Sequence, residues 1–201
     1  MEDKRIVYFD IETQKSADEV GGWDNKHLMK MAVGIVYDSL DGKFYTYLEG
    51  DAEGLVKKLL SADLVVGFNI LNFDFAVLQP YTIIDLKSNI RYFDILKDVY
   101  SRLGYRVSLN QIAKRTLHIE KSGNGLLSLQ WFKEGKLDKI IEYCIKDVEI
   151  TRDVFLFGLK NRYLEFEKNS QSIRLTVNWN LEEMLEKKQN NHTKTQSLKE
   201  Q

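Results

Sequence analysis

The stretch YFDIETQ, Tyr8 to Gln14, places two carboxylates inside a run that otherwise has the composition of a buried β-strand. Successive side chains of a strand point to opposite faces, so Asp10 and Glu12 project from the same face. Two neighbouring carboxylates repel each other, and burying them is costly unless they are paired or bound to a metal ion. Because sites made only of oxygen ligands suit Mg²⁺ or Mn²⁺, this pair predicts a site for a divalent cation.

The composition is that of an ordinary globular protein. The chain has 201 residues, 43% of them hydrophobic and 29% charged, which is enough for one domain with a substantial core. The formal net charge of -1 provides no overall basic field that would attract nucleic acid. It does not exclude nucleic acid, because a metal site is itself acidic and local basic patches can still hold phosphates.

Cysteine content and hydropathy limit the cellular setting. Cys144 is the only cysteine, which excludes an intrachain disulfide and disfavours metal binding through thiolates. The N-terminal residues MEDKR lead directly into the first strand without an apolar signal segment, and no apolar run has the length of a membrane span. We therefore expect a cytoplasmic location.

The hydrophobic pattern predicts a mixed α/β (α+β) domain, in which three antiparallel strands are followed by strands alternating with helices. The expected strands are 5–13, 31–37, 43–48, 64–68 and 90–93, and a C-terminal hairpin is expected at 163–167 and 172–179. The expected helices are 51–61, 72–81, 94–103, 108–117, 126–132, 136–160 and a short charged helix from residue 180 onward. Residues 1–180 are predicted to form a single domain, and 181–201 that helix and a disordered tail.

Further polar residues are predicted where strands end and helices begin, which is where ligand sites of such folds often lie. Asn69 follows the buried strand, and Asp74 falls in the first turn of the next helix. On the long helix, Tyr143 and Asp147 are four residues apart and therefore share a face.

Three of these segments together resemble the motifs of the DEDD exonucleases, which are 3′→5′ exonucleases of the ribonuclease H-like superfamily. The segments are FDIET at 9–13, GFNILNFD at 67–74 and YCIKDVEIT at 143–151. Their order and approximate spacing most resemble the proofreading exonuclease domain of family B DNA polymerases and its stand-alone relatives. The resemblance covers residues 4–160. Tyr143, four residues before Asp147, is typical of the tyrosine subclass (DEDDy), whereas Glu142 occupies the position of the histidine in the other subclass.

The resemblance implies a ribonuclease H-like fold and a two-metal-ion exonuclease. The enzyme would remove nucleoside 5′-monophosphates from single-stranded 3′ ends, with DNA favoured over RNA. Asp10, Glu12 and Asp147 would hold one Mg²⁺ or Mn²⁺, Asp10 would be shared with a second ion, and Asp74 would contribute directly or through water. With a reference pKa near 10, Tyr143 is expected to orient the attacking water rather than to act as a strong base.

The resemblance also implies contacts with the substrate. Its expected substrate-binding residues are Ile11, Thr13, Asn69, Phe73 and Lys121. Phe73 would stack on a base, and Lys121 lies in a loop at 121–125 that would close over the strand. Lys114 and Arg115 are further candidates for phosphate contacts.

Several residues have a simpler structural interpretation. Asp94 is expected to cap a helix, Phe73 also fits a core position, and the three tryptophans, Trp23, Trp131 and Trp179, are expected to pack. Two other functions stay open: a non-catalytic nucleic-acid-binding module of the same fold, and a phosphatase with an aspartyl nucleophile. Residues 161–201 lie outside the motifs and are a candidate element for partner docking or oligomerisation.

Overall fold

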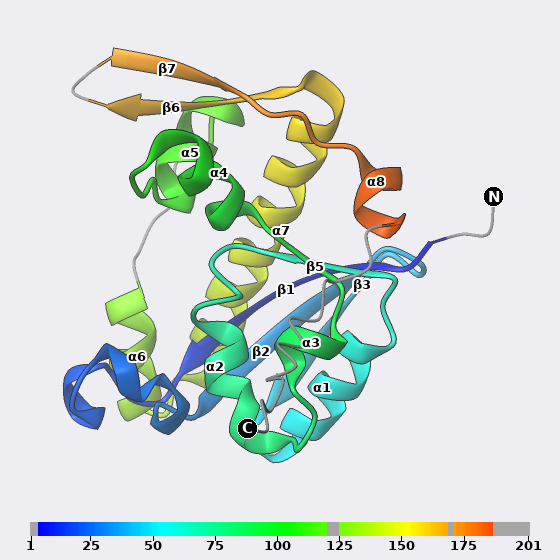
Figure 1. Cartoon of the computed structure of the whole chain (residues 1–201). Helices are drawn as coiled ribbons and strands as arrows, with labels where there is room; N and C mark the ends of the chain where they lie inside the picture. The colour runs from blue at the N-terminus through cyan, green and yellow to red at the C-terminus, as the bar shows by residue number, and fades with distance from the viewer. Residues whose placement is uncertain (1–3, 120–124, 169–170, 187–201) are drawn as a thin grey trace, which may run out of the picture.

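Strand β1, Ile6–Thr13, lies in the middle of the sheet around which the chain folds (Figure 1). The structure, a computed structural model, describes residues 4–119, 125–168 and 171–186, and within them this sheet has five strands in the order β3-β2-β1-β4-β5. The first three strands are antiparallel neighbours, whereas β4 and β5 run parallel to β1. The other strands are β2 Met31–Asp38, β3 Lys43–Leu48, β4 Leu64–Gly67 and β5 Tyr92–Asp94. The predicted fold class, a mixed sheet flanked by helices with a C-terminal hairpin, is confirmed.

Helices cover both faces of this sheet. The helices are α1 Ala52–Leu60, α2 Asp74–Leu78, α3 Leu86–Asn89, α4 Ile95–Leu103, α5 Leu109–Thr116, α6 Gly125–Lys133, α7 Leu137–Asn161 and α8 Leu181–Glu186. Short 3-10 helices are η1 Asp18–Val20, η2 Trp23–Leu28, η3 Glu49–Asp51 and η4 Gln79–Tyr81. Helix α7 contacts β1, β2 and β4, whereas α1 and α2 belong to the core on the other face.

The alternation of side chains along β1 determines which residues face α7. Tyr8 packs into the hydrophobic cluster that includes α7, whereas Phe9 and Ile11 pack into the cluster that includes α1 and α2. Positions 10 and 12 have the same parity as Tyr8, so the carboxylates of Asp10 and Glu12 project toward α7. The strand thus presents two acidic groups to the longest helix of the described chain.

The C-terminal hairpin packs beside α5 at one end of the molecule (Figure 1). Its strands are β6 Tyr163–Lys168 and β7 Gln171–Thr176, so the second strand ends three residues earlier than predicted. After β7 the chain returns to α7, where the ring of Trp179 occupies the space beside Gly158. A Cβ atom at Gly158 would lie 2.3 Å from Cζ3 of Trp179, so only glycine permits this approach.

Helices α4 and α5 each begin with a side-chain cap, and the cap predicted at Asp94 is confirmed. Ser108 caps α5 in a capping box with Gln111, and Asp94 caps α4 by accepting the backbone N–H of Lys97 at 3.1 Å. Asp51 occupies the N-cap position of α1, but its side chain makes no capping hydrogen bond.

The largest departure from the sequence prediction concerns residues 14–29, for which no helix was predicted and which contain η1 and η2. The helix predicted at 72–81 is also divided into α2 and η4, and α3 was not predicted. These are elements of three to six residues, too short to produce a periodic hydrophobic pattern.

Some predictions concern residues 120–124 and 187–201, which lie outside the described residues, including Lys121, most of the proposed 121–125 loop and the C-terminal tail. Among the described residues, no helix is both long enough and apolar enough to cross a membrane.

Candidate metal and nuclease site

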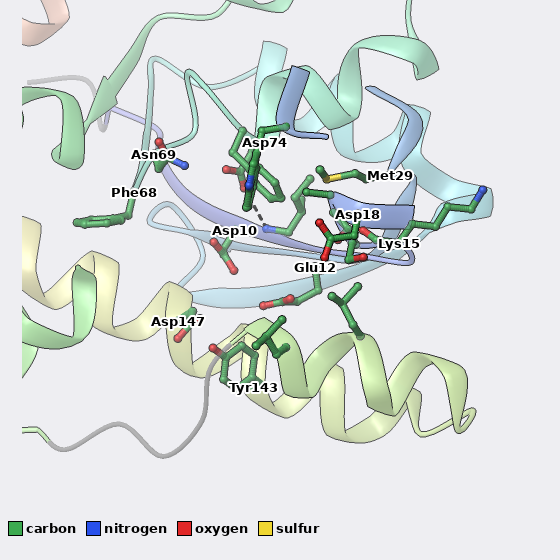
Figure 2. Close-up of a pocket in the computed structure, with 18 residues that line it drawn as sticks. Asp10, Glu12, Lys15, Asp18, Met29, Phe68, Asn69, Asp74, Tyr143 and Asp147 are labelled. Atoms are coloured by element: carbon green, nitrogen blue, oxygen red, sulfur yellow. Dashed lines mark hydrogen bonds between the residues drawn. The ribbon is translucent and has the colours of Figure 1, made fainter. Parts of the chain in front are cut away.

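Three carboxylates converge between β1 and α7. One oxygen atom of each of Asp10, Glu12 and Asp147 lies within 4.8 Å of the others (Figure 2). Glu12 and Asp147 are only 9% and 8% exposed, so their repulsion is weakly screened by water. A set of three carboxylates at this spacing fits a divalent cation such as Mg²⁺ or Mn²⁺.

Asp74 brings a fourth carboxylate to the same pocket from the start of α2. Its side chain is 2% exposed, and its Oδ1 accepts the backbone N–H of Ile11 at 3.2 Å (Figure 2). Burial, followed by repulsion from Asp94 and Glu12, raises the pKa of Asp74 well above its usual range. A bound cation would act in the opposite direction and favour the charged carboxylate.

Tyr143 lies one helical turn before Asp147 on the face of α7 that borders the acidic cluster (Figure 2). Burial raises the pKa of its hydroxyl, and the charges of Asp147, Glu12 and Asp10 raise it further. Tyr143 therefore keeps its proton at neutral pH and can donate a hydrogen bond, but it cannot serve as an anionic base.

Two buried side chains, those of Ser128 and Cys144, bond to residues of this cluster. Ser128 of α6 donates its hydroxyl to Oε2 of Glu12. The thiol of Cys144 donates to the carbonyl oxygen of Asp10 at 3.3 Å and lies 3.5 Å from its Oδ2. Burial, together with the three carboxylates, raises the pKa of Cys144, so the thiol stays protonated and adds no further negative charge. Neither contact was predicted, because each joins residues more than a hundred positions apart.

The four carboxylates and Tyr143 line a pocket of 580 Å³. It brings together nine of the predicted site residues, namely Asp10, Ile11, Glu12, Thr13, Asn69, Phe73, Asp74, Tyr143 and Asp147. Lys114 and Arg115 do not line it, and the guanidinium of Arg115 instead pairs with Glu167 of the hairpin.

The loop after β4 aims Asn69 at the pocket. Asn69 has a left-handed backbone with φ of 69°, and its N–H donates to Oδ1 of Asp94 at 2.9 Å. The other oxygen of Asp94 accepts the N–H of Leu71 at 3.0 Å. At Gly67, a Cβ atom would lie 2.2 Å from Cγ2 of Ile70, so glycine allows the loop to fold back tightly. Asp94 therefore shapes this loop as well as capping α4.

Trp23 was predicted to be a packing residue, but it contacts the ring of Phe73 and otherwise lies largely exposed. Its side chain is 65% exposed and lines the pocket, as do Lys15, Asp18, Leu126 and Leu129, which were not predicted. The position of Trp23 in the sequence could have indicated that it lines the pocket. This large aromatic residue follows two glycines in the polar segment after the strand that carries the acidic pair.

Comparison with known proteins assigns the family. A model of the RNase H superfamily matches residues 7–156. The chain belongs to the RNase H superfamily. A search of curated protein sequences finds no match.

Among solved structures, this RNase H superfamily domain is similar to the family B DNA polymerase from the hyperthermophilic archaeon Pyrobaculum calidifontis. The TM-score is 0.57 and the sequence identity 17%, over 80% of this chain and 26% of the polymerase chain. The chain thus spans about a quarter of the length of that polymerase, and the likeness shows a shared fold.

Proposed function

We propose that this protein is a metal-dependent 3′→5′ exonuclease of the tyrosine subclass, and that residues 1–180 carry the activity. The observation that carries this proposal is the convergence of Asp10, Glu12, Asp147 and Tyr143 at one pocket that also contains Asp74. These residues come from three separate segments of the chain, in the order of the three motifs that the sequence resembles.

In this proposal the carboxylates are the metal ligands. Asp10, Glu12 and Asp147 would hold one divalent cation, and Asp10 and Asp74 would hold a second. Their all-oxygen donor set and mutual repulsion suit Mg²⁺ or Mn²⁺. When bound, such ions lower the pKa of an attacking water and stabilise the oxygen that leaves. Ser128 and Cys144 would position Glu12 and Asp10 for this role.

Tyr143 would donate a hydrogen bond that orients the water at the scissile phosphate, because its raised pKa keeps the hydroxyl protonated. Ile11, Thr13, Asn69 and Phe73 would contact the terminal nucleotide, since all four line the pocket. Lys121 stays a candidate from the sequence resemblance alone. The similar solved structure is that of a DNA polymerase, which favours DNA over RNA as the substrate.

A gel assay tests this function. Single strands of DNA and RNA labelled at the 5′ end would be incubated with Mg²⁺, Mn²⁺ or chelator, using wild-type protein, Asp10→Asn, Asp147→Asn and the exposed control Asp138→Asn. We expect a metal-dependent ladder that shortens from the 3′ end with wild type and the control, and its loss with the two ligand variants.

The same assay separates the other functions. Folded wild-type protein that binds strands without shortening them in any metal would indicate a non-catalytic binding module. Release of inorganic phosphate from a monoester, without shortening of the polymer, would indicate a phosphatase.

A further inference from the structure

One part of the pocket wall is aromatic and does not come from any of the three motif segments alone. Trp23 of η2 and Phe73, which precedes α2, both line the pocket, with ring centroids 6.3 Å apart and ring planes inclined by 58°. Phe73 is half-buried, whereas Trp23 is 65% exposed. The indole of Trp23 therefore offers a large apolar surface to the pocket, and the described part of the chain leaves most of it exposed.

The backbone around Trp23 is well supported, so its exposure does not result from a lack of local structure. Gly21 and Gly22 turn the chain with φ of 80° and 122°, and the N–H of Gly22 donates to the carbonyl of Ala17 at 2.7 Å. The side chain of Asn25 donates to the carbonyl of Val20 at 2.9 Å, and η2 contacts α2. Trp23 is thus presented from a folded connection, which lowers the entropic cost of using it as a binding surface.

The rest of the pocket suits the two parts of a nucleotide, with apolar surface for the base and an acidic cluster that would act through cations on the phosphate. Leu126 and Leu129 of α6 add aliphatic surface to the same pocket, and Leu126 is 71% exposed. The acidic cluster would hold the cations that in turn bind a phosphate. A volume of 580 Å³ is in the range of pockets that enclose ligands of nucleotide size.

We propose that Trp23 stacks on the base of the 3′-terminal nucleotide and thereby makes the site select an unpaired end of any sequence. This inference rests on the proposed exonuclease function and adds a substrate-binding residue to it. An aromatic face binds every base, because stacking requires no hydrogen-bond pattern. A base in a duplex must first leave its stack and its partner to reach Trp23, so a frayed or single-stranded end is favoured.

The predicted effect is a loss of binding rather than of chemistry. Trp23→Ala removes the stack and is expected to raise KM and the dissociation constant about 5- to 150-fold, with a smaller change in kcat. Trp23→Phe keeps an aromatic face and should restore most of the affinity. Tyr100→Ala is the matched control, because Tyr100 is an aromatic residue 49% exposed on α4 that does not line the pocket.

The decisive experiment compares a normal strand with one whose 3′-terminal nucleotide lacks its base. Both strands carry a terminal phosphorothioate linkage that slows cleavage, and binding in Mn²⁺ is measured by fluorescence anisotropy with wild type, Trp23→Ala, Trp23→Phe and Tyr100→Ala. The four combinations of Trp23 or alanine with base or no base form a thermodynamic cycle. We expect Trp23→Ala to weaken binding of the normal strand and to leave the abasic strand unchanged.

Each other result has a defined meaning. Suppose that the wild-type protein shortens DNA, but that Trp23→Ala weakens binding of both strands equally or of neither. This result would overturn the role of Trp23 and leave the proposed function intact. A folded wild-type protein that neither shortens nor binds any strand overturns the proposed function and this inference with it.

Discussion

Asp74 illustrates how a single residue links the site to the stability of the protein. It is almost fully buried, its pKa is raised by burial and by nearby carboxylates, and its proposed role as a metal ligand would require it to be charged. In metal-free protein this residue is therefore destabilising at neutral pH. Its carboxyl binds a proton more tightly in the folded state than in the unfolded state, so stability is lost as pH rises from about 4 toward the raised pKa.

The substitution Asp74→Asn should remove this pH dependence. In chelator, we expect the variant to unfold at a higher temperature than wild type, with a difference that grows from pH 5 to pH 8. Each unit by which the pKa is raised corresponds to about 1.4 kcal/mol. Asparagine retains an oxygen that can accept the N–H of Ile11. Thermal unfolding followed by circular dichroism measures the difference in stability. A variant less stable than wild type at pH 8 in chelator would show that the carboxyl of Asp74 does not destabilise the folded protein.

A second prediction at the scale of the residue concerns the contribution of Ser128 to metal affinity. Its hydroxyl donates to Oε2 of Glu12, and removing such a support for a ligand typically weakens metal binding 10- to 100-fold. We expect Ser128→Ala to raise the Mn²⁺ concentration that half-activates the proposed exonuclease about tenfold, with near-normal activity at saturating Mn²⁺. Ser101→Ala on α4 is the control, because Ser101 is exposed and its hydroxyl donates to the carbonyl of Asp98 within its own helix. Unchanged metal activation in Ser128→Ala would exclude this supporting role.

At the scale of the element, the sequence was informative where an element is long or strictly alternating. The pattern of β1 predicted that Asp10 and Glu12 share a face, and the spacing in α7 predicted that Tyr143 and Asp147 share another. Elements of a few residues, such as η2, have no such period. The exposure of Trp23 and the contact of Ser128 with Glu12 depend on how distant elements pack, and no local pattern encodes that packing.

The contact between α7 and the segment after β7 provides the prediction for an element. Alanine at position 158 would improve helix propensity by about 1 kcal/mol, but its Cβ would lie 2.3 Å from Cζ3 of the buried Trp179. Because the ring is packed against Phe93 and Phe155, it cannot move away freely. We expect Gly158→Ala to lower the free energy of unfolding by about 1–3 kcal/mol in urea denaturation. Gly50→Ala, where a Cβ meets nothing within 4 Å, should change stability little, and a stabilised Gly158→Ala would contradict the packing argument.

At the scale of the whole molecule, the acidic pocket joins elements that are far apart in the chain. β1 contributes the carboxylates of Asp10 and Glu12, α2 and α7 contribute those of Asp74 and Asp147, and α6 contributes the serine that bonds to Glu12. The fold must therefore hold these four carboxylates in one pocket against their mutual repulsion. A cation that binds only the folded state would relieve that repulsion and stabilise all of these elements together.

The last prediction follows from this linkage. Adding Mn²⁺ at about 100 times its dissociation constant should stabilise the wild-type protein by about 2.7 kcal/mol. For a chain of this size, that corresponds to a rise in Tm of roughly 5–10 °C. Asp147→Asn should lose most of this rise because it removes one ligand of the cluster, whereas the exposed control Asp138→Asn should keep it. Thermal scans with and without chelator measure the effect. An identical shift in both variants would place the stabilising ion elsewhere, and no shift in wild type would argue against a metal site formed by Asp10, Glu12 and Asp147.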